Sequence, residues 1–409
     1  PWDLAFGSGL QTAGVLLAVL AVGWSMDRGM VMKEMLSDGD SHAHRSLFLW
    51  VRWVIPVAIL SVGGWWFATE ALPALAADQE GQEAVTLSWE QQDSNLSSSL
   101  RGLSAVGDQV AWVSGSEGSF AFTRDGGESW VAGSVPGADS LDFRDVQAFP
   151  DGTAYLMSAG SGPFSRIYKS QDWGESWTLQ HTNEIPEGFF NGFAFWDRDH
   201  GILVGDPVEG SLFILVTADG GVRWNRLTEE AAPSVVEGEY GFAASGTNIA
   251  VFGTEGVAIA SGGTVARVFR SEDRGVSWEV VQTPMSSGEP TKGAFSIAFG
   301  PMGEAVVVGG DYQSPDLTGS TVARSSDAGR SWALAPGSDA VGFRSGVAYL
   351  PHPEHSLWVT VGTPGSSYSV DGGRTWVGFD TTPFNAVAFA TVSGWAAGPD
   401  GSVARLSIQ

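Results

Sequence analysis

The chain has no cysteine and little positive charge. Its 409 residues include 21 Lys and Arg against 46 Asp and Glu, a formal net charge of −25, and only three of these cations are lysines. Without cysteine, disulfides and thiolate metal sites are excluded. Without clustered Lys and Arg, the chain cannot displace the counterions of a phosphate backbone, so nucleic acid is excluded as a partner.

Charge of either sign is absent from two stretches near the beginning of the chain. Residues 4–26 form an uncharged run of 23 residues, long enough as a helix to cross a hydrocarbon core of about 30 Å. A second uncharged run covers residues 53–69. We therefore predict two transmembrane helices, at about 4–26 and 47–70, with residues 1–72 as the membrane part. Tryptophans are expected at the membrane interface, at Trp2, Trp24, Trp53, Trp65 and Trp66.

The few basic residues of this part predict its orientation. Arg28, Lys33 and Arg45 lie between the two runs, and no basic residue precedes the first. Because cytoplasmic loops are enriched in Lys and Arg, loop 27–46 is predicted to be cytoplasmic, in an inner membrane. The amino terminus and the rest of the chain, after the linker 73–83, are then expected in the periplasm. The absence of an initial Met suggests a processed chain or a start within a longer reading frame.

Metal-binding patterns are weak. His42 and His44, and His352 and His355, have spacings seen in metal sites, but each pair lies in a predicted loop without further ligands nearby. Solvated histidines are the simpler interpretation, and neither a metal nor a cofactor is predicted.

The most informative feature is a phrase repeated six times, Ser/Thr-x-Asp-x-Gly-x-x-Trp, known as the Asp box. Its aspartates are separated by 47, 47, 54, 54 and 44 residues, the period of one four-stranded propeller blade. Ser/Thr and Asp side chains can bond to the amides of a tight turn, Gly allows positive φ, and Trp packs between sheets. We therefore assign the repeat a structural role in preference to calcium or sugar binding. The repeated residues are Asp125, Asp172, Asp219, Asp273, Asp327 and Asp371, followed by Trp130, Trp177, Trp224, Trp278, Trp332 and Trp376.

The strands around the repeats predict seven blades, with six as the alternative count. Three strands follow the last Asp box without a fourth, while residues 84–90 form a lone strand ahead of the first blade. Pairing this strand with the last blade closes the ring and removes two free edges. The predicted fold class is an all-β seven-bladed propeller over residues 84–409, preceded by a two-helix transmembrane hairpin.

One face of the ring is the candidate binding face. Antiparallel order places the Asp boxes on one face and the beginnings of the inner strands on the other. Inner strands are predicted to begin near Tyr240, Phe295 and Asn385, among others, and Glu255 is predicted in a turn on the same face. Arginines at such positions can hold a carboxylate or an acidic segment, or pair with neighbouring acids. The candidate partner-binding residues are Arg101, Arg144, Arg344, Asn191, Asn385, Asp206 and Asp311.

Two resemblances extend this interpretation. Residues 2–9, 22–24 and 52–56 resemble the last two transmembrane helices of bacterial neurotransmitter:sodium symporters, which implies an anchor without the transport machinery. Residues 100–104 and 342–346 are similar to the photosystem II stability and assembly factors, a family of Asp-box propellers. That resemblance implies a seven-bladed fold and an arginine patch, here Arg101, Arg144 and Arg344, that holds a reaction-centre subunit.

The resulting hypothesis is a non-catalytic, membrane-anchored accessory subunit or assembly factor of an integral membrane complex. We expect the partner to be a photosynthetic reaction centre or light-harvesting complex, and we expect the lipid bilayer to surround the anchor. The alternatives are a periplasmic ligand-binding sensor and a sialidase-like glycoside hydrolase. The hydrolase would use Tyr240 beside Glu237 and Glu239, with Asp206 or Asp311 as the acid.

Overall fold

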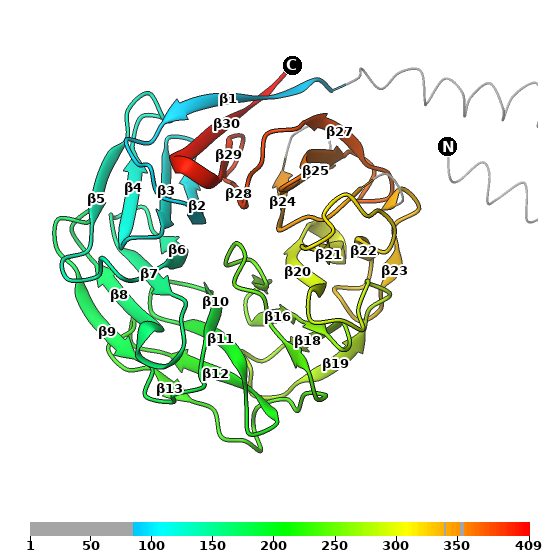
Figure 1. Cartoon of the computed structure of the whole chain (residues 1–409), viewed down its shortest axis with the longest axis horizontal. Coiled ribbons are helices and arrows are strands. Elements are labelled where there is room, and N and C mark those ends of the chain that lie inside the picture. Colours follow the sequence, from blue (N-terminus) through cyan, green and yellow to red (C-terminus); the bar gives the residue numbers. More distant parts are fainter. Residues whose placement is uncertain (1–84, 339–340, 352–355) are drawn as a thin grey trace, which may run out of the picture. The chain divides into compact units, whose positions relative to one another are not determined.

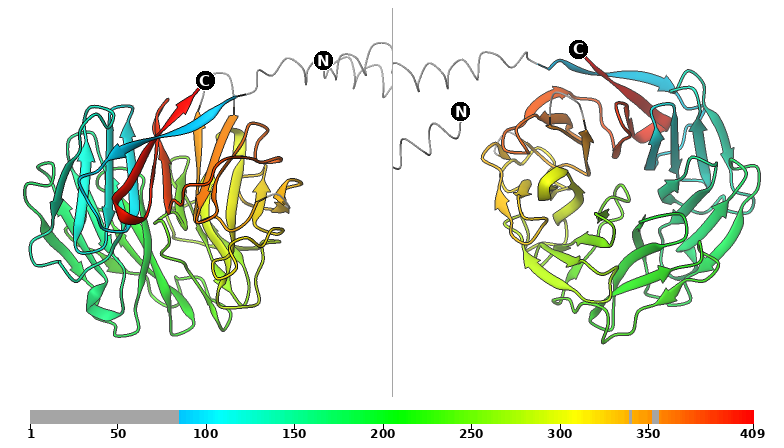
Figure 2. Two further views of the ribbon diagram at one scale, coloured as in Figure 1. Left: turned by 45° about the horizontal axis from the view of Figure 1, so that its top comes forward. Right: turned by 180° about the vertical axis from the view of Figure 1, so that it is seen from behind.

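The computed structural model describes residues 85–338, 341–351 and 356–409, and within them it is all β apart from short turns of 3-10 helix. Seven sheets are arranged around a common axis, as the face-on view shows (Figure 1). Figure 2 shows the same ring tilted and from behind. Residues 86–409 form one compact unit. The predicted seven-bladed propeller is confirmed.

Blades 1 to 3 each contain four consecutive antiparallel strands, ordered from the channel outward. Blade 1 is β2 (Leu100–Gly107), β3 (Val110–Gly115), β4 (Ser119–Thr123) and β5 (Val131–Ser134). Blade 2 is β6 (Phe143–Ala148), β7 (Ala154–Ser158), β8 (Arg166–Ser170) and β9 (Thr178–Thr182), with the turn η4 (Gly162–Phe164). Blade 3 is β10 (Phe190–Phe195), β11 (Gly201–Val208), β12 (Ser211–Thr217) and β13 (Asn225–Arg226).

Blades 4 and 5 depart from this regular pattern. Blade 4 is β15 (Ile249–Phe252), β16 (Gly256–Ala260), β18 (Arg267–Ser271) and β19 (Glu279–Gln282). Blade 5 is β20 (Lys292–Phe299), β21 (Ala305–Asp311), β22 (Val322–Ser325) and β23 (Ala333–Leu334), with η5 (Pro301–Gly303). Two short strands, β14 (Glu239–Tyr240) and β17 (Gly262–Gly263), extend its sheet to six strands.

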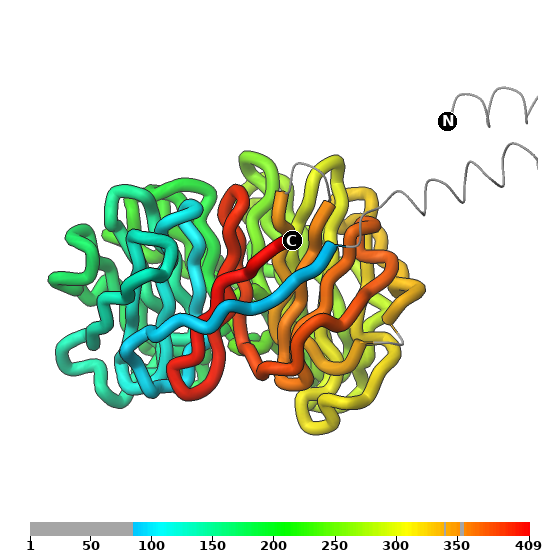
Figure 3. Tube along the Cα trace, turned by 90° about the horizontal axis from the view of Figure 1, so that it is seen from above, coloured from blue at the N-terminus to red at the C-terminus, as the bar shows by residue number. Residues whose placement is uncertain are grey.

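The last two blades complete the ring. Blade 6 is β24 (Gly346–Pro351), β25 (Ser356–Gly362), β26 (Gly365–Ser369) and β27 (Val377–Asp380). Blade 7 is β28 (Ala386–Phe389), β29 (Gly394–Ala397), β30 (Ser402–Ile408) and β1 (Leu87–Asp93), with η7 (Pro399–Gly401). β1 runs antiparallel to β30 from Leu87 opposite Ile408 to Asp93 opposite Ser402 (Figure 3). The first strand of the ring is thereby joined to the last.

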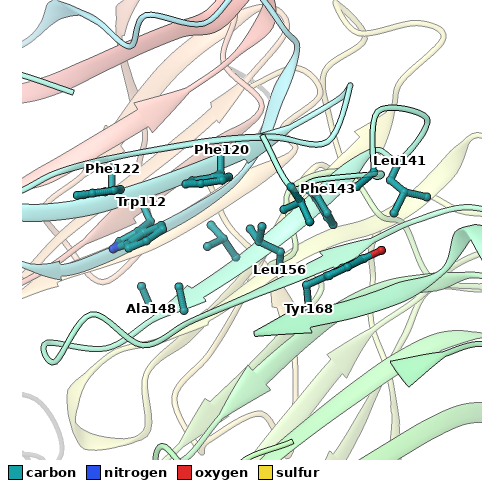
Figure 4. Packing of buried hydrophobic residues seen from close by; sticks show 12 residues of the cluster. Trp112, Phe120, Phe122, Leu141, Phe143, Ala148, Leu156 and Tyr168 are labelled. Atoms are coloured by element: carbon teal, nitrogen blue, oxygen red, sulfur yellow. The ribbon is translucent and has the colours of Figure 1, made fainter. Parts of the chain in front are cut away.

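The hydrophobic core lies between adjacent blades. Trp112 of blade 1 is fully buried and stacks on Phe122 with ring centroids 4.6 Å apart. The side chains of Phe143 and Leu156 of blade 2 belong to the same buried cluster (Figure 4). Comparable clusters join blades 7 and 1, blades 3 and 4, and blades 5 and 6, and each contains the large aromatic side chains expected between sheets.

The six repeated turns all use the same hydrogen bonds. In the first, Thr123 Oγ1 accepts from the Gly127 amide at 2.8 Å and donates to Asp125 Oδ1 at 2.7 Å. The Ser129 amide donates to the same carboxylate oxygen at 2.9 Å. The corresponding Gly amide bonds in the other five turns are 2.8–3.0 Å long. Each carboxylate is therefore engaged within its own turn.

The sequence interpretation of blade 4 was wrong in register. Its inner strand begins at Ile249, and Tyr240 belongs to β14. Glu255 consequently lies between β15 and β16, on the face of the Asp boxes. No helix in the described part of the chain is long and apolar enough to cross a membrane. The two predicted membrane helices, their interfacial tryptophans and both histidine pairs lie outside the described residues.

Candidate functional site

A pocket opens at the centre of the face opposite the Asp boxes. Its volume is about 430 Å³, within the range of about 300–1,000 Å³ usual for small-molecule sites. It collects side chains from the beginnings of several inner strands. Five candidate residues predicted from the sequence line it: Arg101, Arg144, Asn191, Asp206 and Asn385.

The floor of the pocket is a segment that crosses the channel, residues 241–248, which we call the plug. It joins β14 to β15 and is seen as the green loop inside the ring in Figure 1. The Ser245 hydroxyl donates to the Ser345 carbonyl at 2.7 Å, and the Ile297 amide donates to the Thr247 carbonyl at 2.9 Å. The plug is therefore bonded to blades 5 and 6, far from its own place in the sequence.

Two arginines bond to the plug from the other side of the ring. Arg101 Nη1 donates to the Ala244 carbonyl at 3.3 Å, and Arg144 Nη1 donates to the Ala243 carbonyl at 3.2 Å. Arg144 also pairs with Asp142 at 2.7 Å, whereas no ion pair to Arg101 is found among the described residues. Burial, followed by repulsion from Arg144, lowers the pKa of Arg101. This end of the pocket carries more positive charge than its neighbours neutralise.

A carboxyl group lines the pocket from blade 3. Asp206 accepts a hydrogen bond from Asn191 Nδ2 at 2.8 Å. Burial is the main cause that raises the pKa of Asp206, against the lowering effect of the bonds from Asn191 and the Gly241 amide. The fifth predicted residue, Asn385, donates from Nδ2 to the buried Leu100 carbonyl at 2.8 Å, which ties blade 7 to blade 1.

Aromatic rings make up one wall of the pocket, and the sequence did not predict this wall. Phe242 stacks on Phe295 with centroids 3.7 Å apart, and Phe295 meets Phe343 edge-on at 4.9 Å. Tyr240 and Tyr312 contact this cluster, and Tyr312 is 47% exposed. The only sequence signal was the aromatic residue at or near several predicted strand starts.

Two predicted residues do not line the pocket. Arg344 is buried and bonds to the Phe343 carbonyl and the Ser367 hydroxyl, both at 2.9 Å. Burial lowers its pKa to about 10. Asp311 is also buried, and it accepts from the Gln313 amide at 3.0 Å. Of the three arginines predicted to converge, two therefore line the pocket and one lies inside the protein.

The residues proposed for a hydrolase are used in other interactions. Glu239 is buried and pairs with Arg267, whose Nε lies 3.0 Å from Glu239 Oε1. The Tyr240 hydroxyl donates to the Pro290 carbonyl. Neighbouring residues on a strand point to opposite faces, so Glu239 does not share the pocket with Tyr240. In the described ranges, no group of three His, Cys, Asp or Glu side chains is placed to hold a metal ion.

Comparison with solved structures supports the propeller. YCF48 bound to a D1 peptide shares 18% identity with the chain at a TM-score of 0.57, covering 78% of this chain and 94% of that one. YCF48 from Cyanidioschyzon merolae shares 16% at a TM-score of 0.55, covering 78% and 98%. A xyloglucanase from Xanthomonas campestris shares 16% at 0.53, covering 78% of this chain and 53% of the enzyme.

These likenesses establish the fold, which accommodates both binding proteins and enzymes. No family model matches the chain. No curated protein matches it in sequence.

Proposed function

We propose that the chain is a non-catalytic accessory or assembly factor of an integral membrane complex, and that its pocket face holds a segment of a partner subunit. We name a photosynthetic reaction centre as the complex. The proposal includes an inner-membrane anchor in residues 1–72 and a propeller on the periplasmic side. The observation that carries the proposal is the pair Arg101 and Arg144 at the pocket of a propeller similar in fold to YCF48, one structure of which contains a D1 peptide.

The chemistry of this end suits an acidic segment. Guanidinium groups form paired hydrogen bonds to carboxylates, and these bonds strengthen where water is excluded. The chain as a whole is strongly acidic. The positive end of the pocket, where Arg101 and Arg144 lie, favours one place and one orientation for an acidic partner, and repulsion elsewhere on the surface disfavours other contacts.

The test is co-purification from native membranes. Tagged full-length chain is solubilised in mild detergent, separated by size, and its pigments and subunits are identified. We expect migration with a pigment-containing complex, and loss of this association in the double variant Arg101→Gln, Arg144→Gln. Arg374→Gln, which changes an exposed arginine of the sixth repeated turn, is the matched control and should behave as wild type. Recovery of the wild type only as a free monomer would contradict the proposal.

The alternative is a glycoside hydrolase, which the fold likeness to a xyloglucanase keeps open. The pairing of Glu239 with Arg267 argues against the sialidase-like arrangement. Hydrolysis of a fluorogenic sialoside by the purified chain, lost in Tyr240→Phe, would favour the enzyme over the accessory factor.

A further inference from the structure

The pocket carries opposite charges at two places that do not neutralise each other. Arg101 is influenced electrostatically by Arg144 and Asp142, whereas Asp206 is influenced by hydrogen bonds from Asn191 and Gly241. No ion pair joins Asp206 to an arginine among the described residues. Each charged group is therefore partly removed from water without a full counter-charge, which is costly unless a ligand supplies one.

One wall of the pocket, formed by blades 5 and 6 and the plug, is apolar and aromatic. Phe242, Phe295 and Phe343 are buried against one another, while Tyr240 and Tyr312 border them. Such a wall takes up an apolar side chain by burying its surface, and tyrosine rings also attract an ammonium group. The cavity of about 430 Å³ is of a size for a small molecule.

The geometry points to a free α-amino acid with an aromatic or large aliphatic side chain as the ligand of this pocket. Its carboxylate is held by Arg101 and Arg144, its ammonium by Asp206, which Asn191 positions, and its side chain by the aromatic wall. A zwitterion supplies the counter-charge that each end lacks, which neither a simple carboxylate nor a simple amine can do. This inference goes beyond the proposed function, because it gives the pocket a small-molecule ligand rather than a partner polypeptide.

Because the plug closes one side of the pocket, the pocket can take up only a small molecule or the end of a longer one. The carbonyls of Ala243 and Ala244 hold one N–H of each arginine, and the plug backbone closes the pocket from below. A ligand enters from the open face, where Tyr312 is exposed. A free amino acid carries its carboxylate, its ammonium and its side chain on one carbon atom, so all three can contact the pocket together.

The test is isothermal titration calorimetry on the full-length chain in detergent. The probes are L-phenylalanine and L-leucine, with three analogues of phenylalanine that each lack one feature: 3-phenylpropionate has no amine, phenethylamine has no carboxylate, and N-acetyl-L-phenylalanine has no ammonium charge. We expect at least one of the two amino acids to bind, and every analogue to bind at least tenfold more weakly than phenylalanine. Absence of binding by both amino acids up to about 10 mM, a concentration well above the Kd of even a weak specific site, would overturn the inference.

Variants assign the two ends separately. Asp206→Asn should weaken phenylalanine at least tenfold and leave 3-phenylpropionate unchanged, because only the ammonium contact is lost. Arg101→Gln should weaken phenylalanine and 3-phenylpropionate but leave phenethylamine unchanged. Glu230→Gln, an exposed acid outside the pocket lining, is the matched control and should leave all affinities unchanged. If Asp206→Asn binds phenylalanine as the wild type does, the ammonium site is refuted.

N-acetyl-L-phenylalanine also separates this inference from the proposed function. If it, or a peptide ending in phenylalanine, binds as tightly as the free amino acid, the pocket reads only a carboxyl terminus and the small-molecule inference fails. The accessory-factor proposal would survive that result, since it is judged by co-purification with a membrane complex. Conversely, amino-acid binding without any co-purified complex would refute only the proposed function.

Discussion

Asp145 is a buried carboxyl group beneath the pocket floor. It is 6% exposed, accepts a hydrogen bond from the Phe193 amide at 2.9 Å, and packs against Gly246 of the plug. Burial, the largest effect, raises its pKa from the ordinary 3.8 to about 8. The folded protein therefore keeps a proton on Asp145 at neutral pH that the unfolded chain releases.

This difference predicts how stability depends on pH. Because the folded state binds the extra proton between pH 3.8 and about 8, the contribution of Asp145 to stability is fully present below 3.8 and is lost as the pH rises through about 8. Asp145→Asn keeps the shape of the side chain but cannot bind or release this proton. We expect the free energy of unfolding of this variant, relative to wild type, to increase by roughly 1 kcal/mol per pH unit between pH 5 and 7.5. Urea denaturation at several pH values measures it.

Asp139→Asn provides the control for this pH series. Asp139 is exposed, so its replacement should leave the pH dependence of the wild type unchanged. A constant difference between Asp145→Asn and wild type across the pH range would show that Asp145 is ionised in the folded state. The assignment of a neutral acid would then be wrong.

At the residue scale, the candidate site could be predicted only in part. The positions of Arg101 and Arg144 follow from the beginnings of the inner strands, which the repeat locates. Arg344 occupies a similar place in the sequence, but its side chain bonds to Ser367 within blade 6. The direction of a side chain at a strand end depends on local backbone geometry, and the repeat carries no information about it.

At the scale of elements, the plug is the main feature that the sequence did not predict. Its residues, Gly-Phe-Ala-Ala-Ser-Gly-Thr-Asn, form an apolar run followed by a small and polar run, as in a short strand and turn. The spacing of 54 residues between Asp219 and Asp273, against 47 in the earlier repeats, was the available signal of an insertion. Its path across the channel depends on contacts with blades 2, 5 and 6, which are distant in sequence.

Gly246 provides a test of the plug. It has a φ of +74°, and an added Cβ would lie 2.2 Å from Asp145 Cγ. Gly246→Ala should therefore destabilise the protein through both backbone strain and overpacking, by roughly 2–4 kcal/mol. Gly253, with a φ of +58° and no atom within 4 Å of an added Cβ, is the matched control. Gly253→Ala should cost only the strain, roughly 1 kcal/mol.

Urea unfolding of the two variants makes the comparison. If they lose equal stability, the plug does not pack against Asp145 as described. A greater loss for Gly246→Ala supports the close approach, since the strain is common to both positions. The same two variants test whether the pocket depends on the plug, because Gly246 belongs to the plug and Gly253 does not.

At the scale of the whole molecule, the architecture follows from the repeat. Six turns at near-constant spacing, each stabilised within itself, place the third and fourth strands of six blades. The seventh blade has no such turn, and its existence follows from the need to pair the unmatched strands at the two ends of the ring. The strand predicted at residues 84–90 is observed as β1, Leu87–Asp93, with a shift of three residues at each end. The sequence pattern determines the ends of a strand less well than its existence.

Trp89 on β1 allows ring closure to be tested. Its indole is 8% exposed, lies with its centroid 5.5 Å from Phe384 and 5.8 Å from Phe379, and donates to Ser366 Oγ at 2.9 Å. It therefore connects the closing strand to blade 6 as well as to blade 7. Trp89→Ala should destabilise the propeller by about 3–5 kcal/mol, because burying a large aromatic ring contributes energy of that size.

Two further variants separate closure from a local effect. Trp89→Phe keeps most of the packing and loses the hydrogen bond to Ser366, so it should cost about 1 kcal/mol for that bond and somewhat more for the smaller ring. Ser88→Ala changes the exposed neighbour on the same strand and should be neutral. Closing the ring couples the first and last strands. Trp89→Ala should therefore also increase the rate of proteolysis, with cleavage in blades 6 and 7 before cleavage in blades 2 and 3. Uniform proteolysis of all blades, with an unfolding midpoint equal to that of Ser88→Ala, would mean that β1 does not hold the ring closed.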